Sequence, residues 1–263
     1  MSDQLSLRLE PAVPNPPATL RPMLDRPLPE PFDSPGHLFE PIWGGVRALA
    51  VIGPAEAVGG GEVVLVGEDG ARLSPTPIDL AGLATRVAAR SAVLDGEIVV
   101  VDADGRLDRP ELERRLAGEP GRPLAYLAFD ILDLDGVPQL SLPLERRREV
   151  LRRVLRPGDE LVAVPAIAED GRALFEAVAA QGLAGVRARQ AGSPYLPGIR
   201  SRLWRSVAVA PRRRGRSRTS AAVPSGSQPP TGSPSAAPNA EHRAPVLALI
   251  ARLPLGLEDE PGG

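Results

Sequence analysis

Four short stretches of this chain bring together carboxylates, arginines and aromatic rings, and they lie at 37–47, 94–99, 126–136 and 174–189. Arginine can grip a phosphate through two parallel hydrogen bonds, and carboxylate oxygens are ligands that Mg²⁺ prefers. An aromatic ring offers a flat face on which another ring can stack. These stretches are therefore where the candidate site residues of the chain lie.

The chain contains no lysine, because all 31 of its basic residues are arginines. Arginine keeps its proton at any pH that a protein survives, so it cannot act as an amine nucleophile. Chemistry through a lysyl adduct is therefore excluded. Codon usage in a GC-rich genome explains arginine at surface positions, but it does not replace a lysine that a reaction requires.

Composition excludes several other kinds of site. The chain has no cysteine, which excludes disulfide scaffolds and Cys-ligated metal centres. Neither His37 nor His242 has the Ser/His/Asp spacing of a hydrolase, and we expect His37 to pack at the rim of the site. The longest apolar runs, such as 246–251, are far shorter than the roughly 20 residues of a membrane span. We expect a cytoplasmic protein with no membrane contact.

The elements that must position the four stretches follow an α+β pattern between residues 37 and 210. Apolar and β-branched runs predict strands at 46–52, 62–66, 92–101, 124–131, 161–164 and 185–188. Helical periodicity predicts helices at 78–89, 143–155 and 171–181, the last of them ended by Gly182.

The two flanks differ from this central part. Residues 1–36 are proline-rich, which predicts an extended arm laid over the domain. Residues 211–263 are rich in Arg, Ser and Pro, which predicts a disordered tail with a short apolar segment at 244–257. The tail has 7 arginines against 4 acids (+3) and the rest 24 against 29 (−5), which sum to the net −2. The dense basic cluster in the tail is a candidate nucleic-acid site: Arg212, Arg213, Arg214, Arg216 and Arg218.

In order and spacing, the four stretches resemble the nucleotidyltransferase motifs of ATP-dependent DNA ligases, and most closely the ligase module of bacterial end-joining ligases. The similarity covers roughly residues 22 to 209. It implies the α+β fold of the DNA ligase and mRNA capping enzyme adenylation domain, with two antiparallel sheets and flanking helices around a nucleotide cleft. It also implies ATP and Mg²⁺ as cofactors and DNA repair and recombination as the setting. We expect no C-terminal OB barrel, since no run of strands follows Ala210.

The first motif keeps its binding residues and loses its reactive one. In the family, the residue at Glu40 reaches the adenine amine, and the residue at Arg47 contacts the ribose and the phosphate side. The family's nucleophilic lysine, which attacks the α-phosphorus of ATP, corresponds to Ile42, and the aspartate that follows corresponds to Gly44.

The middle motifs are close to the family pattern. The resemblance places Glu97 at the ribose and the metal, and Phe129 against the adenine. Two other interpretations remain open: Asp95-Gly96 is also typical of a hairpin turn, and a buried phenylalanine is commonly a core residue. We expect the arginines at 146–148 to form a solvated helix face.

The last motifs have lost charged groups. A metal-site glutamate of the family corresponds to Ala184, and the lysine that holds the α-phosphate corresponds to Arg189. Two further lysines correspond to Ser206 and Ala208, whereas Trp204 is retained. The resemblance therefore gives a nucleotide site whose binding groups persist, with Glu97 as a weakened metal ligand that lacks its partner at Ala184.

Three functions fit this pattern. The first is a ligase-like pseudoenzyme that binds ATP or DNA but cannot form lysyl-AMP, with an intact ligase or another repair protein as a partner. The second is the sealing of pre-adenylated DNA nicks without self-adenylation. The third is a non-catalytic interaction protein that acts through the arginine-rich tail, for which a merely solubilising tail is the alternative.

Overall fold

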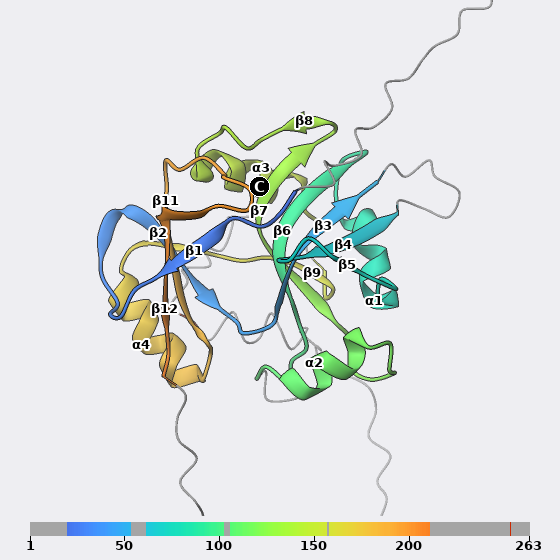
Figure 1. Cartoon of the computed structure of the whole chain (residues 1–263), viewed down its shortest axis with the longest axis horizontal. Coiled ribbons are helices and arrows are strands. Elements are labelled where there is room, and N and C mark those ends of the chain that lie inside the picture. Colours follow the sequence, from blue (N-terminus) through green and yellow to red (C-terminus); the bar gives the residue numbers. More distant parts are fainter. Residues whose placement is uncertain (1–19, 54–61, 103–105, 157, 211–252, 254–263) are drawn as a thin grey trace, which may run out of the picture.

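We describe the chain from a computed structural model, in which residues 20–53, 62–102, 106–156, 158–210 and 253 are described. Two β-sheets lie side by side, and four α-helices lie around them (Figure 1). The expected α+β fold with two sheets is confirmed. None of the helices in the described ranges has the length and apolar character that crossing a membrane requires.

The larger sheet carries the strands that the apolar runs predict. Its order is β5 (Arg72–Leu73), β4 (Val63–Gly67), β3 (Val46–Ile52), β6 (Ala92–Val99), β7 (Ala125–Leu134) and β8 (Val137–Pro138), and β9 (Leu161–Ala163) pairs in parallel with β7. Its other pairings are antiparallel. Asp95 and Gly96 lie inside β6, so the hairpin-turn interpretation of this dipeptide is wrong.

The smaller sheet pairs strands from the beginning of the described domain with strands from its end. Its order is β1 (Leu24–Pro27), β12 (Arg200–Ala208), β11 (Gly185–Gln190), β2 (Ser34–Ile42) and β10 (Ile167–Glu169). The β1–β12 pair is parallel and the other pairs are antiparallel. Each sheet therefore contains one parallel pair, whereas two purely antiparallel sheets were expected. Such pairs form here because long connections return the chain in the same direction.

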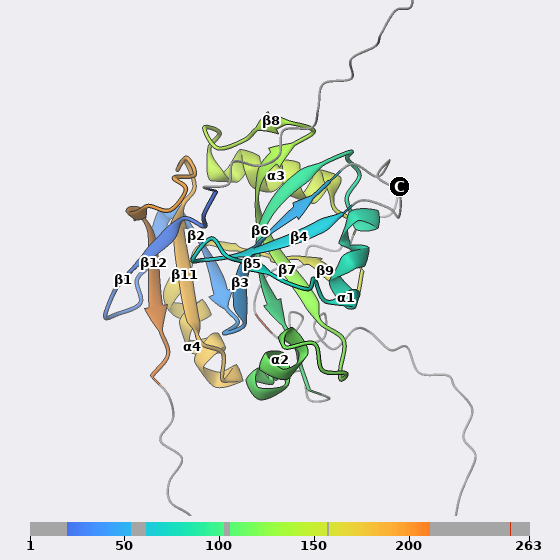
Figure 2. The ribbon, with the colours of Figure 1, turned by 45° about the vertical axis from the view of Figure 1, so that its right-hand side comes forward.

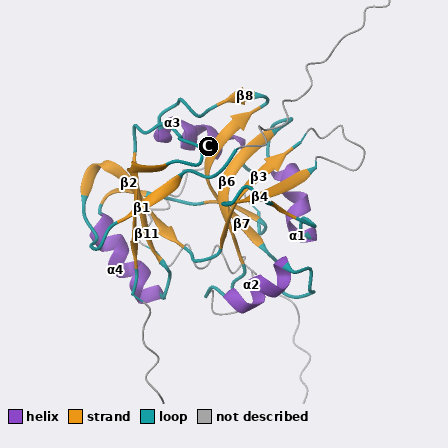
Figure 3. Cartoon of the chain, in the orientation of Figure 1, coloured by secondary structure: helices purple, strands orange, loops and turns teal. Residues whose placement is uncertain are grey.

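Four helices cover the sheets, as Figures 2 and 3 show. They are α1 (Ile78–Ala81), followed by a 3₁₀ turn at Gly82–Arg86, α2 (Arg109–Leu116), α3 (Leu144–Val154) and α4 (Gly171–Gln181). The predicted helix at 78–89 is thus shorter than expected. Helix α4 ends as predicted at Gly182, whose φ of 73° suits glycine. Helix α3 packs on β7, and α4 packs on β2 and β11.

Strand β7 lies between two apolar cores because its side chains alternate. Tyr126 and Ala128 face a core that α1, α3 and the larger sheet share, whereas Leu127 and Phe129 face a second core with α4 and the smaller sheet. The hydroxyl of Tyr126 donates to the Ala48 carbonyl oxygen at 2.8 Å. Through β7, the two sheets are held in a fixed relation around the four motifs.

Candidate functional site

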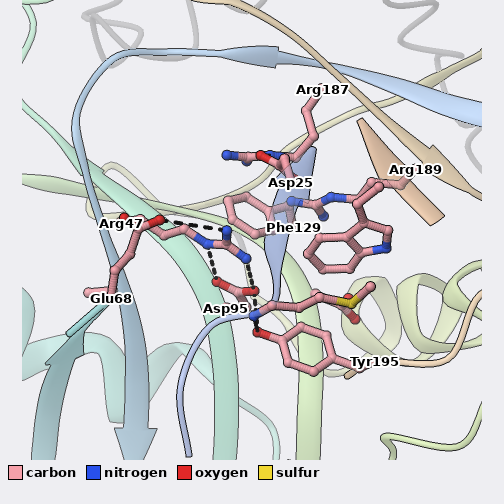
Figure 4. A network of polar contacts seen from close by, with 12 residues as sticks. Asp25, Arg47, Glu68, Asp95, Phe129, Arg187, Arg189 and Tyr195 are labelled. Carbon is pink, nitrogen blue, oxygen red and sulfur yellow. Dashed lines mark hydrogen bonds and ion pairs between the residues drawn. The ribbon is translucent and has the colours of Figure 1, made fainter. Parts of the chain in front are cut away.

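The structure brings the six predicted nucleotide-binding residues to neighbouring strands of the two sheets. They are Glu40 on β2, Arg47 on β3, Glu97 on β6, Phe129 on β7, Arg189 on β11 and Trp204 on β12. All six side chains are buried, and several contact one another directly (Figure 4). The structure shows that these side chains lie close together, whereas their role in binding a nucleotide stays a prediction.

Arg189 lies between two aromatic rings. Its Cζ atom is 4.1 Å from the centroid of the Phe129 ring and 4.3 Å from that of Trp204. Its Nη1 atom is 3.2 Å from Oε2 of Glu40, yet none of its three guanidinium nitrogens has a hydrogen-bond partner among the described residues. Burial lowers the pKa of Arg189 to about 10, although the charge of Glu40 opposes this. The guanidinium thus covers the ring that was expected to stack on adenine.

Glu40 is held by an arginine of α3 as well. Arg148 donates from Nη1 to Oε1 of Glu40, and also to the carbonyl oxygens of Phe129 and Val164. The neighbouring Arg147 donates from Nε and Nη2 to the two oxygens of Asp130 at 2.8 and 2.9 Å.

The expectation of a solvated arginine face on this helix is therefore wrong for Arg147 and Arg148, which are buried. Of the three arginines at 146–148, Arg146 alone remains at the surface, where it pairs with Glu149. Buried carboxylates on β2 and β7 attract the two other side chains inward, because a buried charge needs an opposite charge nearby.

Arg47 is fixed by a chain of polar contacts. Its Nε and Nη2 atoms donate to the two oxygens of Asp95 at 3.1 and 2.7 Å. The hydroxyl of Tyr195 donates to Oδ2 of Asp95 at 2.7 Å, and the backbone amide of Met23 donates to that hydroxyl at 2.9 Å. Burial opposes the charge of Arg47, but Asp95 outweighs it and raises the pKa of the guanidinium. None of these partners, Asp95, Tyr195 and Met23, was predicted as a site residue.

Glu97 holds the turn between β2 and β3. Its Oε1 atom accepts a hydrogen bond from the backbone amide of Gly45. A Cβ atom at Gly45 would lie 2.1 Å from the Ile98 carbonyl oxygen, so this approach requires glycine. Burial raises the pKa of Glu97, although the charge of Arg187 and the turn amides oppose the rise. The carboxylate is thus engaged in backbone contacts.

The two positions that the resemblance marks as reactive are neighbours. Ile42 ends β2, and its carbonyl oxygen accepts a hydrogen bond from the amide of Ala184 at 3.0 Å. Both side chains are hydrocarbons, which offer neither a nucleophile nor a metal ligand. The described residues include no group of three or more metal-ligating side chains. With Glu97 bound to the Gly45 amide and Ala184 in the partner position, this set does not fit a two-carboxylate Mg²⁺ site.

A further ion pair completes the cluster. Oδ2 of Asp25, on β1, lies 2.6 Å from Nε of Arg187, on β11. The guanidinium carbons of Arg187 and Arg47 lie 5.3 and 5.5 Å from the centroid of the Phe129 ring. Asp25 was missed because it falls in the proline-rich arm, outside the four motif stretches. The basic cluster at 212–218 lies outside the described residues.

A model of the family described as ATP dependent DNA ligase domain matches residues 68–207. A DNA ligase of Methanothrix thermoacetophila is 36% identical over 132 residues, which are 46% of this chain and 24% of that protein. The multifunctional non-homologous end joining DNA repair protein LigD of Mycobacterium tuberculosis is 31% identical over 166 residues, 63% of this chain and 21% of that protein. The chain thus spans about a quarter of the length of the curated relatives it matches.

Two solved structures that are similar to this chain also come from DNA ligases. A mycobacterial DNA ligase D complexed with ATP and MES has a TM-score of 0.60 and 26% identity, and the match covers 73% of this chain and 60% of that one. The ligase domain of M. tuberculosis LigD has a TM-score of 0.60 and 28% identity, with 72% and 59% covered.

Proposed function

The chain belongs to the ATP-dependent DNA ligase domain family, and on that premise we propose that it is a ligase-like protein of DNA repair and recombination that cannot load itself with AMP. The observation that carries this proposal is the hydrocarbon side chain of Ile42 at the position of the nucleophilic lysine, in a chain without any lysine. Transfer of a nucleotidyl group needs an in-line nucleophile and groups that stabilise charge on the phosphate oxygens. Neither an amine nor a hydroxyl stands at position 42.

The contacts around the motifs also support a low affinity for ATP and Mg²⁺, which is part of the same proposal. The face of Phe129 on which a purine would stack is covered by Arg189, and Glu40 is paired with Arg148. A nucleotide would have to displace buried groups from one another before it could occupy these positions. Ala184 supplies no oxygen to a metal ion beside Glu97. We therefore propose that ATP binds weakly and reversibly, and that Mg²⁺ adds little to its affinity.

The test is incubation of the purified chain with α-labelled ATP and Mg²⁺, followed by denaturing gel electrophoresis and intact-mass measurement. No covalent AMP should be found, whereas an intact ATP-dependent ligase treated in parallel should carry the label. A labelled adduct on any side chain of this protein would refute the proposal. Calorimetric titration with ATP, with and without Mg²⁺, measures the reversible binding.

The other two functions have their own tests. Sealing of a pre-adenylated nick at high protein concentration would favour an enzyme that uses Arg47, Glu97 and Arg189 without self-adenylation. Loss of nucleic-acid affinity on deletion of residues 211–263 would favour the arginine cluster of the tail as the binding element. DNA, an intact ligase or another repair protein are the partners to try in both cases.

A further inference from the structure

We propose that the Asp25 carboxylate competes with the phosphate of a ligand for Arg187. It occupies the anion position beside that guanidinium, and the pairing of strand β1 holds it there. This inference rests on the proposed function, because it concerns how the same site receives a phosphate-bearing ligand. It adds a specificity-determining residue that lies outside the four motifs.

The arginines that could receive a phosphate surround one ring. The guanidinium carbons of Arg47, Arg187 and Arg189 lie 5.5, 5.3 and 4.1 Å from the centroid of the Phe129 ring. The closest carboxylate is Asp95 for Arg47, Asp25 for Arg187 and Glu40 for Arg189, and Arg47 has a longer contact with Glu68 as well. Figure 4 shows Asp25 beside Arg187, next to the Phe129 ring.

Asp25 has fewer side-chain partners than the other two carboxylates, although Glu40 likewise has one oxygen, Oε2, without a hydrogen-bond partner among the described residues. One oxygen of Asp25 lies 2.6 Å from Nε of Arg187, whereas the other, Oδ1, is buried without a hydrogen-bond partner among the described residues. Asp95 is bound at both oxygens by Arg47 and Tyr195, and Glu40 is shared by Arg148 and Arg189. Because Asp25 has a single charged partner, it is the easiest of the three carboxylates to displace, since the fewest charge-assisted contacts must be broken.

Strand β1 keeps this carboxylate in place. The Leu24 amide donates to the Ile199 carbonyl oxygen at 3.0 Å, and the Leu28 amide donates to that of Ser206 at 2.8 Å. Met23, just before the strand, is fully buried, and its amide is bound by the Tyr195 hydroxyl. These contacts hold β1 on both sides of Asp25, so the carboxylate is delivered to Arg187 by the fold.

The charges make Asp25 act as an anion at neutral pH. Burial alone would raise the pKa of Asp25, but the charges of Arg187, Arg47 and Arg189 outweigh burial and lower it below 3.8. A phosphate that binds Arg187 must therefore replace an ionised carboxylate, and like charges a few ångströms apart repel strongly in a buried site. Removal of the carboxylate should free the anion position and leave the ring contacts unchanged.

The experiment compares Asp25→Asn with the unaltered protein in calorimetric titrations of inorganic tripolyphosphate, ATP and adenosine. We expect D25N to bind tripolyphosphate and ATP about tenfold more tightly or better, because one repulsive charge is gone. Binding of adenosine, which carries no phosphate, should not change. The matched control is Asp33→Asn, which removes the same charge from an exposed ion pair with Arg172. D33N should leave all three titrations unchanged.

An unchanged tripolyphosphate affinity in D25N, or an equal gain in D33N, overturns the proposal. If D25N does not fold, Asp25→Ser removes the same charge with a smaller side chain. Hydrogen exchange of the unaltered protein gives an independent readout, since tripolyphosphate should speed exchange of the β1 amides as it displaces Asp25. Unchanged or slower exchange up to the highest soluble concentration contradicts the competition. All of these measurements report reversible binding. They can therefore contradict the Asp25 proposal whether or not covalent AMP is found.

Discussion

The Cζ atom of Arg189 lies 4.1 Å from the centroid of the Phe129 ring. In the expected site, a nucleotide base covers this ring and a cationic side chain at position 189 holds a phosphate. Here the cation itself covers the ring, with Trp204 on its other side at 4.3 Å. Cation–π contacts of this kind are favourable when the cation is desolvated. These contacts offset part of the cost of burying the Arg189 charge, and they put a side chain of the protein where the base was expected.

Replacement of Arg189 by methionine should not destabilise the fold. The guanidinium is fully buried and makes no hydrogen bond to the part of the chain that the structure describes, and Glu40 keeps Arg148 as a partner. Because an apolar side chain of similar length removes a costly buried charge, we expect R189M to change the free energy of unfolding by less than about 1 kcal/mol, or to raise it. Urea denaturation at pH 7 measures this.

The control for that variant is Arg147→Met on α3. Its guanidinium makes two hydrogen bonds to Asp130, which is fully buried. Without Arg147 that carboxylate loses its ion-pair partner among the described residues, so R147M should lower the free energy of unfolding by about 3 to 5 kcal/mol. Equal effects of the two variants would contradict the distinction between a satisfied and an unsatisfied buried arginine.

Asp25 should make the protein sensitive to acid. Its folded-state pKa lies below its ordinary value of 3.8, so the unfolded chain takes up the proton first as the pH falls. The stabilisation that Asp25 gives is complete above this value and is lost as the pH falls from about 4 toward the folded-state pKa. Denaturant unfolding between pH 6 and 3 should show a smaller loss of stability for D25N than for the unaltered protein. Parallel curves would argue against an ionised Asp25 in the folded state.

Glu97 should tolerate loss of its charge but not loss of its oxygen. Burial raises the pKa of this carboxyl, so the charge is unfavourable, whereas Oε1 is the acceptor for the Gly45 amide. We expect Glu97→Ala to cost about 1 to 3 kcal/mol, because it leaves that amide unpaired, and Glu97→Gln to cost less than about 1 kcal/mol. Thermal unfolding compares the two variants. A loss in E97Q as large as that in E97A would show that the negative charge itself is needed.

Restoring the amine alone should not restore the chemistry. In Ile42→Lys a nucleophile returns to the end of β2, but Arg189 still covers Phe129 and Ala184 still lacks a carboxylate. Attack on phosphorus needs the nucleotide held in line with the amine, so we expect no AMP adduct on I42K after incubation with ATP and Mg²⁺. Intact-mass measurement reads this out, with Ile42→Met as the matched control. An adduct on I42K but not on I42M would show that the lysine was the single missing group.

Much of the fold could be predicted from local sequence. The strand at 46–52 and the helix at 171–181 with Gly182 after it are found where their patterns predict them. Helix α2 was missed because it has few apolar side chains: two leucines and one proline. It does carry the signals of a helix start, since Asp108 is an N-cap that accepts a hydrogen bond from the Glu111 amide, and Pro110 lies in the first turn. Those capping signals could have revealed it.

The contacts of the site could not be predicted in the same way. Periodicity treats every arginine as exposed, so it placed Arg147 and Arg148 on a solvated face. Their burial depends on Asp130 and Glu40, which come from other strands. Likewise, nothing near Asp25 in the sequence indicates Arg187, because that ion pair forms only when the sheet is assembled.

Strand β1 lies in parallel beside β12, and 172 residues separate Met23 from its hydrogen-bond partner Tyr195. During synthesis on a ribosome, the segment that carries Asp25 emerges early and must wait for nearly the whole domain before its neighbours exist. Closing so long a loop is slow relative to local pairing. We therefore expect the larger sheet to form first, and the arginine cluster around Phe129 to receive its last carboxylate only at the end of folding.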